Sequence, residues 1–306
     1  LCTAILDWAS ANDVGFSSVV SMGASVDVDF GEILDYLISD SLTHSILLYI
    51  EGIHDARSFM SSIRAAARIK PVILVKVGRH AAASKAAISH TASIVGADDA
   101  FDAAIRRAGV VRVQTISQLF AAAKALSCGF DPTGNRLAIV TNGGGPGVMA
   151  TDYALDLGLV MAQLSEVTMA KLNQALPSTW SHGNPVDIIG DAQVERYQDA
   201  VKACLEDPNV DGVLAILTPQ AMTKPLEVAQ AMIELSNQYK KPLLSSWMGE
   251  AQVQASRSAF NAARKPSFRN PESAVDVFSF LSAYHNNQRL LMQMPGPISH
   301  LSLIHI

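Results

Sequence analysis

The sequence has few charged residues, no long apolar run and no excess of positive charge, and each absence excludes a class of protein. Charged residues make up 17% of the 306 residues and hydrophobic residues 49%, which excludes a disordered chain. The formal net charge of −5 gives no attraction to nucleic acid or to an anionic membrane. No apolar run approaches the roughly 20 residues that cross a bilayer, and the first residues do not resemble a signal peptide. We therefore expect a soluble cytoplasmic protein that binds neither nucleic acid nor membrane.

Cysteine is also scarce, and its positions suggest neither a disulfide framework nor a metal site. Cys2, Cys128 and Cys204 are odd in number and far apart, so reduced thiols are expected. Surface positions account for the histidines that lack the spacing of metal ligands, namely His44, His54, His80, His182 and His285. We predict no metal site.

Both ends of the sequence look cut. Leu1 opens directly into a helical pattern, with no capping residue and no initiator methionine. Residues 291–306 contain a Pro-Gly-Pro stretch and end in Leu301–Ile306, which connects to no recognisable element. We interpret residues 291–306 as a tail, which could be non-native. We interpret the whole chain as a fragment.

The rest of the chain alternates between short apolar runs and amphipathic helical patterns. Strands are predicted at 16–22, 45–50, 72–77, 110–113 and 137–141. Helices are predicted at 30–38, 56–67, 98–108 and 116–125, and another begins near Met149. This alternation is typical of α/β proteins in which helices cover both faces of a parallel sheet. Pro132 and Gly134 mark a boundary between two such series.

The two series resemble each other in order and in detail. Asp40–Ile50 aligns with Asp207–Leu217, and the later Lys70-Pro71 and Lys241-Pro242 each open a strand. Further on, both series carry a similar helical stretch, at Ala100–Ala104 and Ala259–Ala263. The sequence therefore predicts two doubly wound, parallel-sheet domains with flavodoxin-like strand order, at residues 1–130 and 136–290.

The first series differs from the second by an inserted loop, Gly78–Gly96, which follows a predicted strand and contains His90. Open α/β sheets bind ligands beyond the carboxyl ends of their strands. An imidazole there can act as a nucleophile towards phosphoryl groups when its second nitrogen is held by a partner. Glu51, at the end of a neighbouring strand, could be that partner. The alternatives are a surface or helix-capping histidine and an ordinary exposed glutamate.

A second candidate site is the turn at Asn142, Gly143, Gly144, Gly145 and Gly147, which links a strand to a helix. Glycines expose backbone N–H groups, and a helix start carries partial positive charge, so such a turn can bind phosphate. It is neither a dinucleotide fingerprint nor a P-loop, and the alternative is a tight turn that needs glycine for its geometry alone. Residues beside these motifs that could line the same cleft are Gly78, Arg79, Ser89, Thr91, Asn184 and Asp187. For Asn184 and Asp187 the alternative is a plain turn.

These motifs in this order resemble the NDP-forming acyl-CoA synthetases, which are relatives of succinyl-CoA synthetase. The resemblance is carried by Tyr49–Gly52, the loop through Ser89-His90-Thr91, Phe101–Ala104, Asn142–Gly147 and Asn184–Asp187. Members of that family interconvert acyl-CoA, ADP and phosphate with a free acid, CoA and ATP. The resemblance implies that His90 becomes phosphohistidine, that Glu51 steadies it, and that Asn142–Gly147 begins a helix that holds phosphate.

The resemblance also implies partners. The family's CoA-binding domain and its ATP-grasp domain, which binds the nucleotide with Mg, are not in this sequence, and a second phosphate-holding helix would start before Leu1. The fragment alone is therefore expected not to turn over, and an oligomer is expected. After Thr91 this chain has Ala92-Ser93, where many synthetases have Gly-Ala.

Two alternatives to an enzyme of phosphoryl transfer remain at this stage. Leu1–Asp7, Val26–Phe30 and Ile33–Leu37 resemble the ligase-like half of Pat-type protein lysine acetyltransferases, which carry a GNAT domain. In such a protein this region would sense a metabolite and His90 could be idle. The other alternative is an interaction or oligomerisation module, although the sequence shows no exposed apolar stripe.

Overall fold

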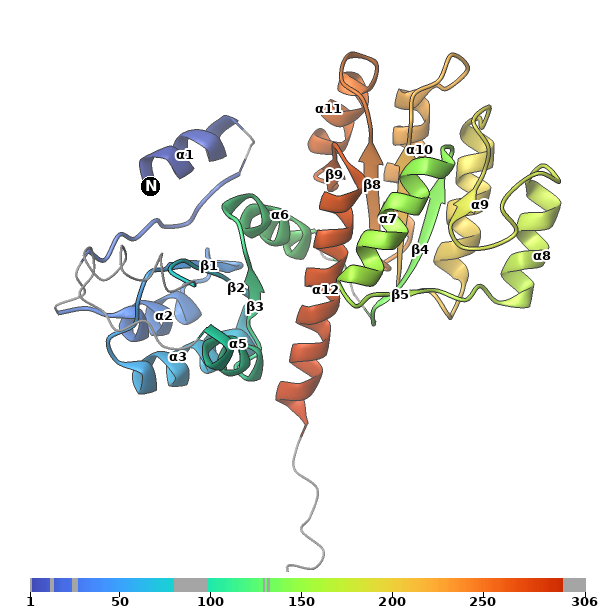
Figure 1. The fold of residues 1–306 in the computed structure, drawn as a ribbon. Helices are drawn as coiled ribbons and strands as arrows, with labels where there is room; N and C mark the ends of the chain where they lie inside the picture. The colour runs from blue at the N-terminus through green and yellow to red at the C-terminus, as the bar shows by residue number, and fades with distance from the viewer. Residues whose placement is uncertain are drawn as a thin grey trace, which may run out of the picture.

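The chain forms two parallel sheets, each covered by helices, in a computed structural model (Figure 1). The structure describes residues 2–11, 14–23, 27–79, 98–128, 130 and 133–293. The helices of the first half are α1 (Cys2–Ala11), α2 (Phe30–Ser39), α3 (Ala56–Ile69), α5 (Asp98–Arg107) and α6 (Ile116–Ser127). Its strands are β1 (Ile46–Ile50), β2 (Val72–Lys76) and β3 (Val111–Val113), which pair in the order β1-β2-β3.

The second half forms a six-stranded sheet with the order β5-β4-β7-β8-β9, and β6 pairs with β4 outside that path. Its strands are β4 (Arg136–Thr141), β5 (Val160–Met161), β6 (Val186–Asp187), β7 (Gly212–Leu217), β8 (Leu243–Trp247) and β9 (Ser267–Phe268). Its helices are α7 (Gly144–Asp156), α8 (Glu166–Ala175), α9 (Val194–Glu206), α10 (Pro225–Gln238), α11 (Gln254–Ala262) and α12 (Pro271–Met292), with a 3-10 turn, η1 (Ala251–Val253). Without β6, this sheet has the flavodoxin-like order that the sequence predicts.

One strand prediction is wrong. Residues 16–22 form neither a helix nor a strand, and Val19 and Val20 are 41% and 50% exposed. Apolar and β-branched residues form a strand only where a neighbouring strand offers partners, because strand preference mainly reflects packing on a sheet. In the described part of this half, β1 pairs with β2 alone, and the segment before it is not added to the sheet.

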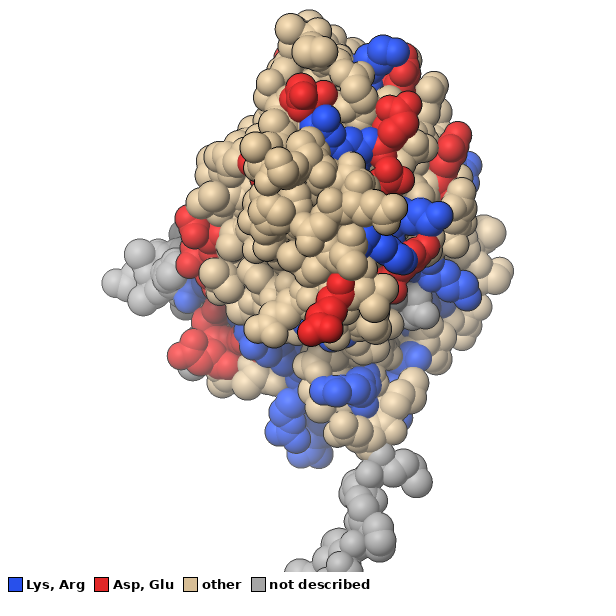
Figure 2. Space-filling model, turned by 90° about the vertical axis from the view of Figure 1, so that its right-hand side faces the viewer, with Lys and Arg blue, Asp and Glu red and all other residues tan. Residues whose placement is uncertain are grey.

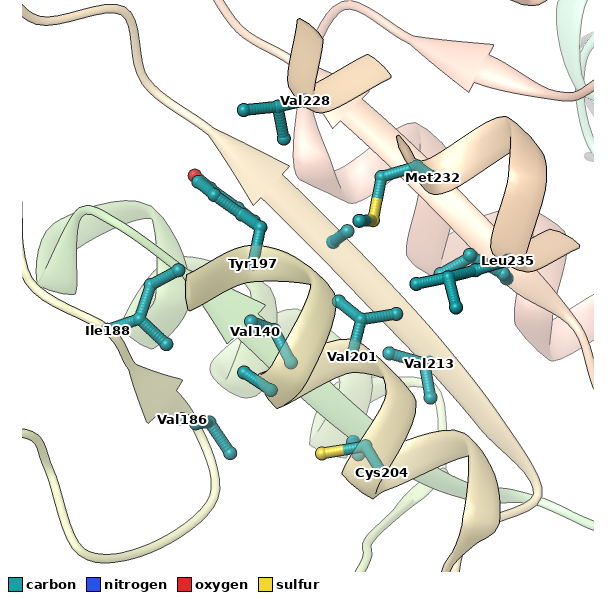
Figure 3. Close-up of a cluster of buried hydrophobic side chains, with 14 of the residues drawn as sticks. Val140, Val186, Ile188, Tyr197, Val201, Cys204, Val213, Val228, Met232 and Leu235 are labelled. Atoms are coloured by element: carbon teal, nitrogen blue, oxygen red, sulfur yellow. The ribbon is translucent and has the colours of Figure 1, made fainter. Parts of the chain in front are cut away.

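Each sheet is buried because its strands are apolar on both faces. All five residues of β2 and all six of β7 are buried, as expected for central strands covered by helices on both sides. Figure 3 shows the largest cluster, in which α9 and α10 lay Tyr197, Val201 and Met232 on β4 and β7. Among the described residues no helix is long and apolar enough to cross a membrane.

The predicted internal duplication extends to individual hydrogen bonds. Lys70 donates from Nζ to the carbonyl oxygen of Asp40, and Lys241 donates to that of Asp207 at 2.7 Å. In each half a lysine before a proline therefore ties the start of one strand to the turn before the preceding strand. Because both pairs were aligned by sequence alone, this contact supports a common plan for the two sheets.

Helix α12 joins the two halves, because it lies between the two sheets and contacts elements of both (Figure 1). Near its end, Asn287 Nδ2 donates to the Val110 carbonyl at 3.1 Å and Gln288 Nε2 to the Ala67 carbonyl at 2.7 Å. Leu291 packs against Gly109, whose φ of +88° suits glycine. The last turns of α12 thus belong to the packing of the first sheet.

Candidate functional site

The carboxyl edges of the two sheets carry the candidate residues, whereas the outer face of the second half offers no concentration of charge. Figure 2 shows an uncharged centre on that face, with acidic and basic side chains scattered around it. His90, Ser89 and Thr91 lie outside the described residues. The chain that leads towards them is described as far as Gly78 and Arg79, just after the end of β2.

Glu51 and the start of the His90 segment lie at the same edge of the first sheet. Strands β1 and β2 are parallel, with Ile50 opposite Lys76, and the Val77 amide donates to the Ile50 carbonyl at 3.0 Å. Glu51, partly exposed, therefore begins its turn beside Gly78. Burial raises the pKa of Tyr49, and the negative charge of Glu51 raises it further. A carboxylate thus stands at the point where the chain leaves for His90.

The glycine turn forms as predicted between β4 and α7, but its asparagine has a structural task. The Asn142 side chain is buried; its Oδ1 accepts from the amide of Thr218 at 2.8 Å and from its hydroxyl at 2.9 Å. Its Nδ2 donates to the Thr218 carbonyl at 2.8 Å. Asn142 therefore joins the ends of β4 and β7, and its side chain is not directed at a ligand. Thr218 was not predicted from the sequence, because it belongs to no recognisable motif.

The amides of Gly144 and Gly145 are the free donors of this turn. The Gly143 amide donates to Thr141 Oγ1 at 3.0 Å, and the Gly147 amide lies 3.3 Å from the Gly143 carbonyl. Within the described part of the chain, no protein acceptor binds Gly144 or Gly145, and no side chain caps α7. Unpaired amides at a helix start, with its partial positive charge, are able to bind an anion.

Gly144 and Gly145, which carry the two free amides, differ in how much open space surrounds them. A Cβ built on Gly144 would lie 3.0 Å from Asp187 Oδ2, whereas one built on Gly145 would meet nothing within 4 Å. The other carboxylate oxygen of Asp187 accepts from the Ile189 amide at 2.9 Å. Asp187 therefore lies beside the turn, and the open side of the helix start is at Gly145.

Asn184, which is partly exposed, also braces the backbone. Its Nδ2 donates to the carbonyls of Leu137 at 2.8 Å and Ala162 at 3.0 Å, and its Oδ1 accepts from the Ile139 amide at 3.0 Å. All of these contacts are to backbone groups around β4 and β5, and the lining of a cleft by Asn184 stays a prediction. Below the turn, burial raises the pKa of Tyr197 well above its usual value, and its hydroxyl donates to the Ile216 carbonyl at 3.0 Å.

Arg79 lies in a different place from the glycine turn. It lines an open cleft where α3, α5 and β3 of the first half face α12 of the second, together with Asp98 and Arg112. Asp98 and Arg112 were not predicted from the sequence, although a cation in an otherwise apolar strand, at the end of β2 (Lys76) or within β3 (Arg112), is a signal that points to them.

Comparison with known proteins matches both halves of the chain. Residues 1–126 match the family described as the succinyl-CoA ligase-like flavodoxin domain, and residues 137–287 match the ligase-CoA domain. Among curated proteins, acetate–CoA ligase (ADP-forming) I of Archaeoglobus fulgidus is 40% identical over 92% of this chain and 40% of its own length. The alpha subunit of acetate–CoA ligase (ADP-forming) I of Pyrococcus furiosus is 35% identical over 91% of this chain and 60% of its own.

Solved structures agree with these matches. Acetyl-coenzyme A synthetase 1 of Ca. Korarchaeum cryptofilum, described as dinucleotide forming and determined with phosphate and ADP, superposes with a TM-score of 0.88 at 31% identity. That superposition covers 94% of this chain and 63% of the solved chain. The chain thus spans less than two thirds of the relatives and of the solved chain to which it is similar.

Proposed function

Because this chain belongs to the NDP-forming acyl-CoA synthetase family, we propose that it is the phosphoryl-transfer part of such an enzyme, with His90 as the nucleophile. The complete enzyme would interconvert acyl-CoA, ADP and phosphate with a free acid, CoA and ATP, in the cytoplasm. ADP is the nucleotide in the names of the relatives. The observation that carries the proposal is the order of the two matched domains, together with a carboxylate beside the entrance to the His90 segment.

The proposed chemistry transfers one phosphoryl group twice. Phosphate attacks acyl-CoA, which releases CoA and forms an acyl phosphate. A nitrogen of His90 then forms a P–N bond as the P–O bond to the acyl group breaks, and the carboxylate of the acid leaves. A terminal oxygen of ADP finally attacks the phosphorus, which frees the imidazole and forms ATP. Glu51 would accept a hydrogen bond from the second ring nitrogen and stabilise the phosphorylated ring.

Phosphate would be held at the start of α7, by the free amides of Gly144 and Gly145. The geometry favours Gly145 in this role, because the space beside it is open. Asn142 and Asn184 would support the site only indirectly, by fixing the ends of the strands from which it is built.

We propose two domains, at residues 1–130 and 136–290, that work with parts the chain does not contain. Its relatives extend well beyond the region that it covers. Those parts would bind CoA and, through an ATP-grasp domain, the nucleotide with Mg. The alternative of a metabolite-sensing half of a GNAT acetyltransferase is less favoured, because the relatives described above carry the names of CoA ligases.

The test is phosphorylation of the complete protein with ATP labelled in its terminal phosphate. We expect label in an acid-labile, alkali-stable bond that His90→Asn abolishes. The matched control is His182→Asn, because His182 is an exposed histidine of the second half that bonds to Asn173 and Ser178. A wild-type protein that takes up no such label, or takes it up without His90, would contradict the proposal.

Glu51→Gln tests the supporting carboxylate. Loss of a charge-assisted hydrogen bond should shorten the half-life of the phosphoprotein by roughly tenfold. The decay of label after removal of ATP measures this, and an unchanged half-life would leave Glu51 without the proposed role.

A further inference from the structure

A group of charges around the buried Lys76 joins the two ends of the segment that carries His90. Lys76, the last residue of β2, is 6% exposed, and its Nζ lies 3.5 Å from Oδ1 of Asp98, the first residue of α5. Arg112 on β3 donates to both oxygens of Asp98, at 2.7 and 2.8 Å, and lies 3.3 Å from Asp102. The chain from residue 77 to residue 97 therefore leaves and returns at one ion cluster.

An aromatic ring completes this cluster. The Lys76 ammonium and the Arg112 guanidinium lie 5.2 and 5.4 Å from the centre of the Phe101 ring, within the range of cation–π attraction. Burial raises the pKa of Asp98, but the hydrogen bonds and charge of Arg112, with the charge of Lys76, outweigh it, so the net effect is to lower the pKa. Asp98 is thus held as a carboxylate between two cations.

The second half shows how the same place is filled where no segment is inserted. Trp247 ends β8 as Lys76 ends β2, and Phe260 stands where Phe101 does, so the two rings meet at 4.9 Å in an edge-to-face contact. Arg257, the counterpart of Asp98, donates to the Trp247 carbonyl at 3.0 Å. A fully buried tryptophan therefore takes the place of Lys76, while Arg257, whose side chain is 12% exposed, pairs with Glu250 at 3.1 Å.

The difference between Lys76 and Trp247 indicates that the charged residues of the first half have a task other than stabilising the fold. Removing charges from water is costly, and apolar groups that fill the same volume often stabilise a protein as well or better. Trp247 is such an apolar group at the position of Lys76. Of these two positions, only the one beside the long insertion holds a buried lysine, and its ion pair, unlike an apolar contact, has a defined direction and distance.

We propose that Asp98, held by Lys76 and Arg112, is a positioning residue that sets the ends of the 77–97 segment and thereby places His90 for phosphoryl transfer. This inference rests on the proposed function of His90. Asp98 itself makes and breaks no covalent bond. It holds the first residue of α5 next to the last residue of β2.

The experiment compares Asp98→Asn with the wild type in the complete protein, by the initial rate of His90 labelling from ATP and by thermal denaturation. A misplacement of about 1 Å can slow a reaction on the order of 100-fold, so we expect a fall of roughly 10- to 100-fold in the labelling rate. The matched control is Asp211→Asn, which removes a buried carboxylate that pairs with Arg136 at 2.8 Å at the opposite edge of the second sheet. That control should lower the melting temperature and leave the labelling rate unchanged.

A double variant, Lys76→Met with Asp98→Asn, distinguishes positioning from support of the fold. It removes the buried ammonium of Lys76 together with the carboxylate that it faces, so it should recover the melting temperature without recovering the rate. A rate that returns with stability, or a folded Asp98→Asn protein with the wild-type rate, overturns the inference. If Asp98→Asn does not fold, Asp98→Glu keeps the charge but shifts it by one methylene, and a folded Asp98→Glu protein with the wild-type rate overturns it equally. Wild-type protein without His90 label would instead contradict the proposed function itself.

Discussion

Replacing Gly145 with alanine should raise the stability of the protein while it weakens phosphate binding. Gly145 is the second residue of α7, and a Cβ at this position would meet no atom within 4 Å. The backbone there does not have the positive φ that only glycine tolerates well. The substitution therefore adds one methyl group to open space without disturbing the turn.

The expected gain in stability comes from the unfolded chain. Alanine has fewer backbone conformations to lose than glycine, which is worth about 0.4–1 kcal/mol where the native backbone accepts it. In a protein of this size each kcal/mol shifts the melting temperature by about 2–4 °C, so a rise of roughly 1–4 °C is expected.

The expected loss of binding comes from the direction of the new methyl group. Side chains of a helix lean towards its N-terminus, so the Cβ of residue 145 points to the place where an anion would meet the free amides. Losing one hydrogen bond to a charged ligand costs about 1.5–3 kcal/mol, which is roughly a 10- to 100-fold weaker affinity. The same factor should appear in the labelling of His90 when phosphate and acyl-CoA are the substrates.

The assay is equilibrium binding of inorganic phosphate to the complete protein, beside a thermal melt. Gly147→Ala is the contrasting variant, because its Cβ would lie 2.9 Å from Cγ2 of Thr141 and should lower the melting temperature. If Gly145→Ala binds phosphate as the wild type does, the anion does not lie at the start of α7. If its melting temperature falls by several degrees, the described conformation of the turn is wrong.

Three further predictions concern the contacts that hold the site in place. Gly109→Ala would force a Cβ to within 2.2 Å of Leu291 at a positive φ, so we expect a loss of about 2–4 kcal/mol and faster hydrogen exchange at the end of α12. Asn142→Ala leaves the polar backbone atoms of Thr218 unpaired and should destabilise the protein by about 2–4 kcal/mol, measured by urea denaturation. Burial raises the pKa of Asp211, but Arg136 lowers it more strongly, to below the usual 3.8. Its contribution is therefore complete above pH 3.8 and lost as the pH falls through the lower folded value, so Asp211→Asn should flatten the acid side of the stability profile.

The sequence predicts the regular parts of the fold well because their signals are local. Strand β2 and helix α3 follow from an apolar run and from a 3.6-residue period, and they occur within two residues of the predicted bounds. The duplication could also be read from the sequence, since Lys70 and Lys241 each precede a proline. The segment 16–22 could not be predicted correctly, because whether an apolar run pairs depends on a neighbouring strand that the local sequence does not reveal.

The position of the glycine turn could be predicted from the sequence, whereas the tasks of its side chains could not. Backbone geometry explains the success, since a glycine turn after a parallel strand leaves amides free wherever a helix begins. Asn142 and Asn184 show the limit, because an asparagine can bind either a ligand or a backbone group. Only the approach of Thr218 to Asn142, from a strand 76 residues away, decides between these tasks.

The division of the proposed chemistry between two similar sheets makes helix α12 important for the site. The chain that leads to His90 leaves from the first sheet, whereas the free amide of Gly145 follows a strand of the second. The distance between these two parts of the proposed site therefore depends on how α12 joins the two halves. There, Asp276 of α12 accepts from Gln118 of the first half at 3.0 Å and from Tyr153 of α7 at 2.9 Å. Burial, reinforced by Asp276, raises the pKa of Tyr153 to about 12, which keeps its hydroxyl a donor throughout the neutral range. One carboxylate thus links the helix that would hold phosphate to the domain that would carry the nucleophile, so a shift of either domain must strain bonds made by the other.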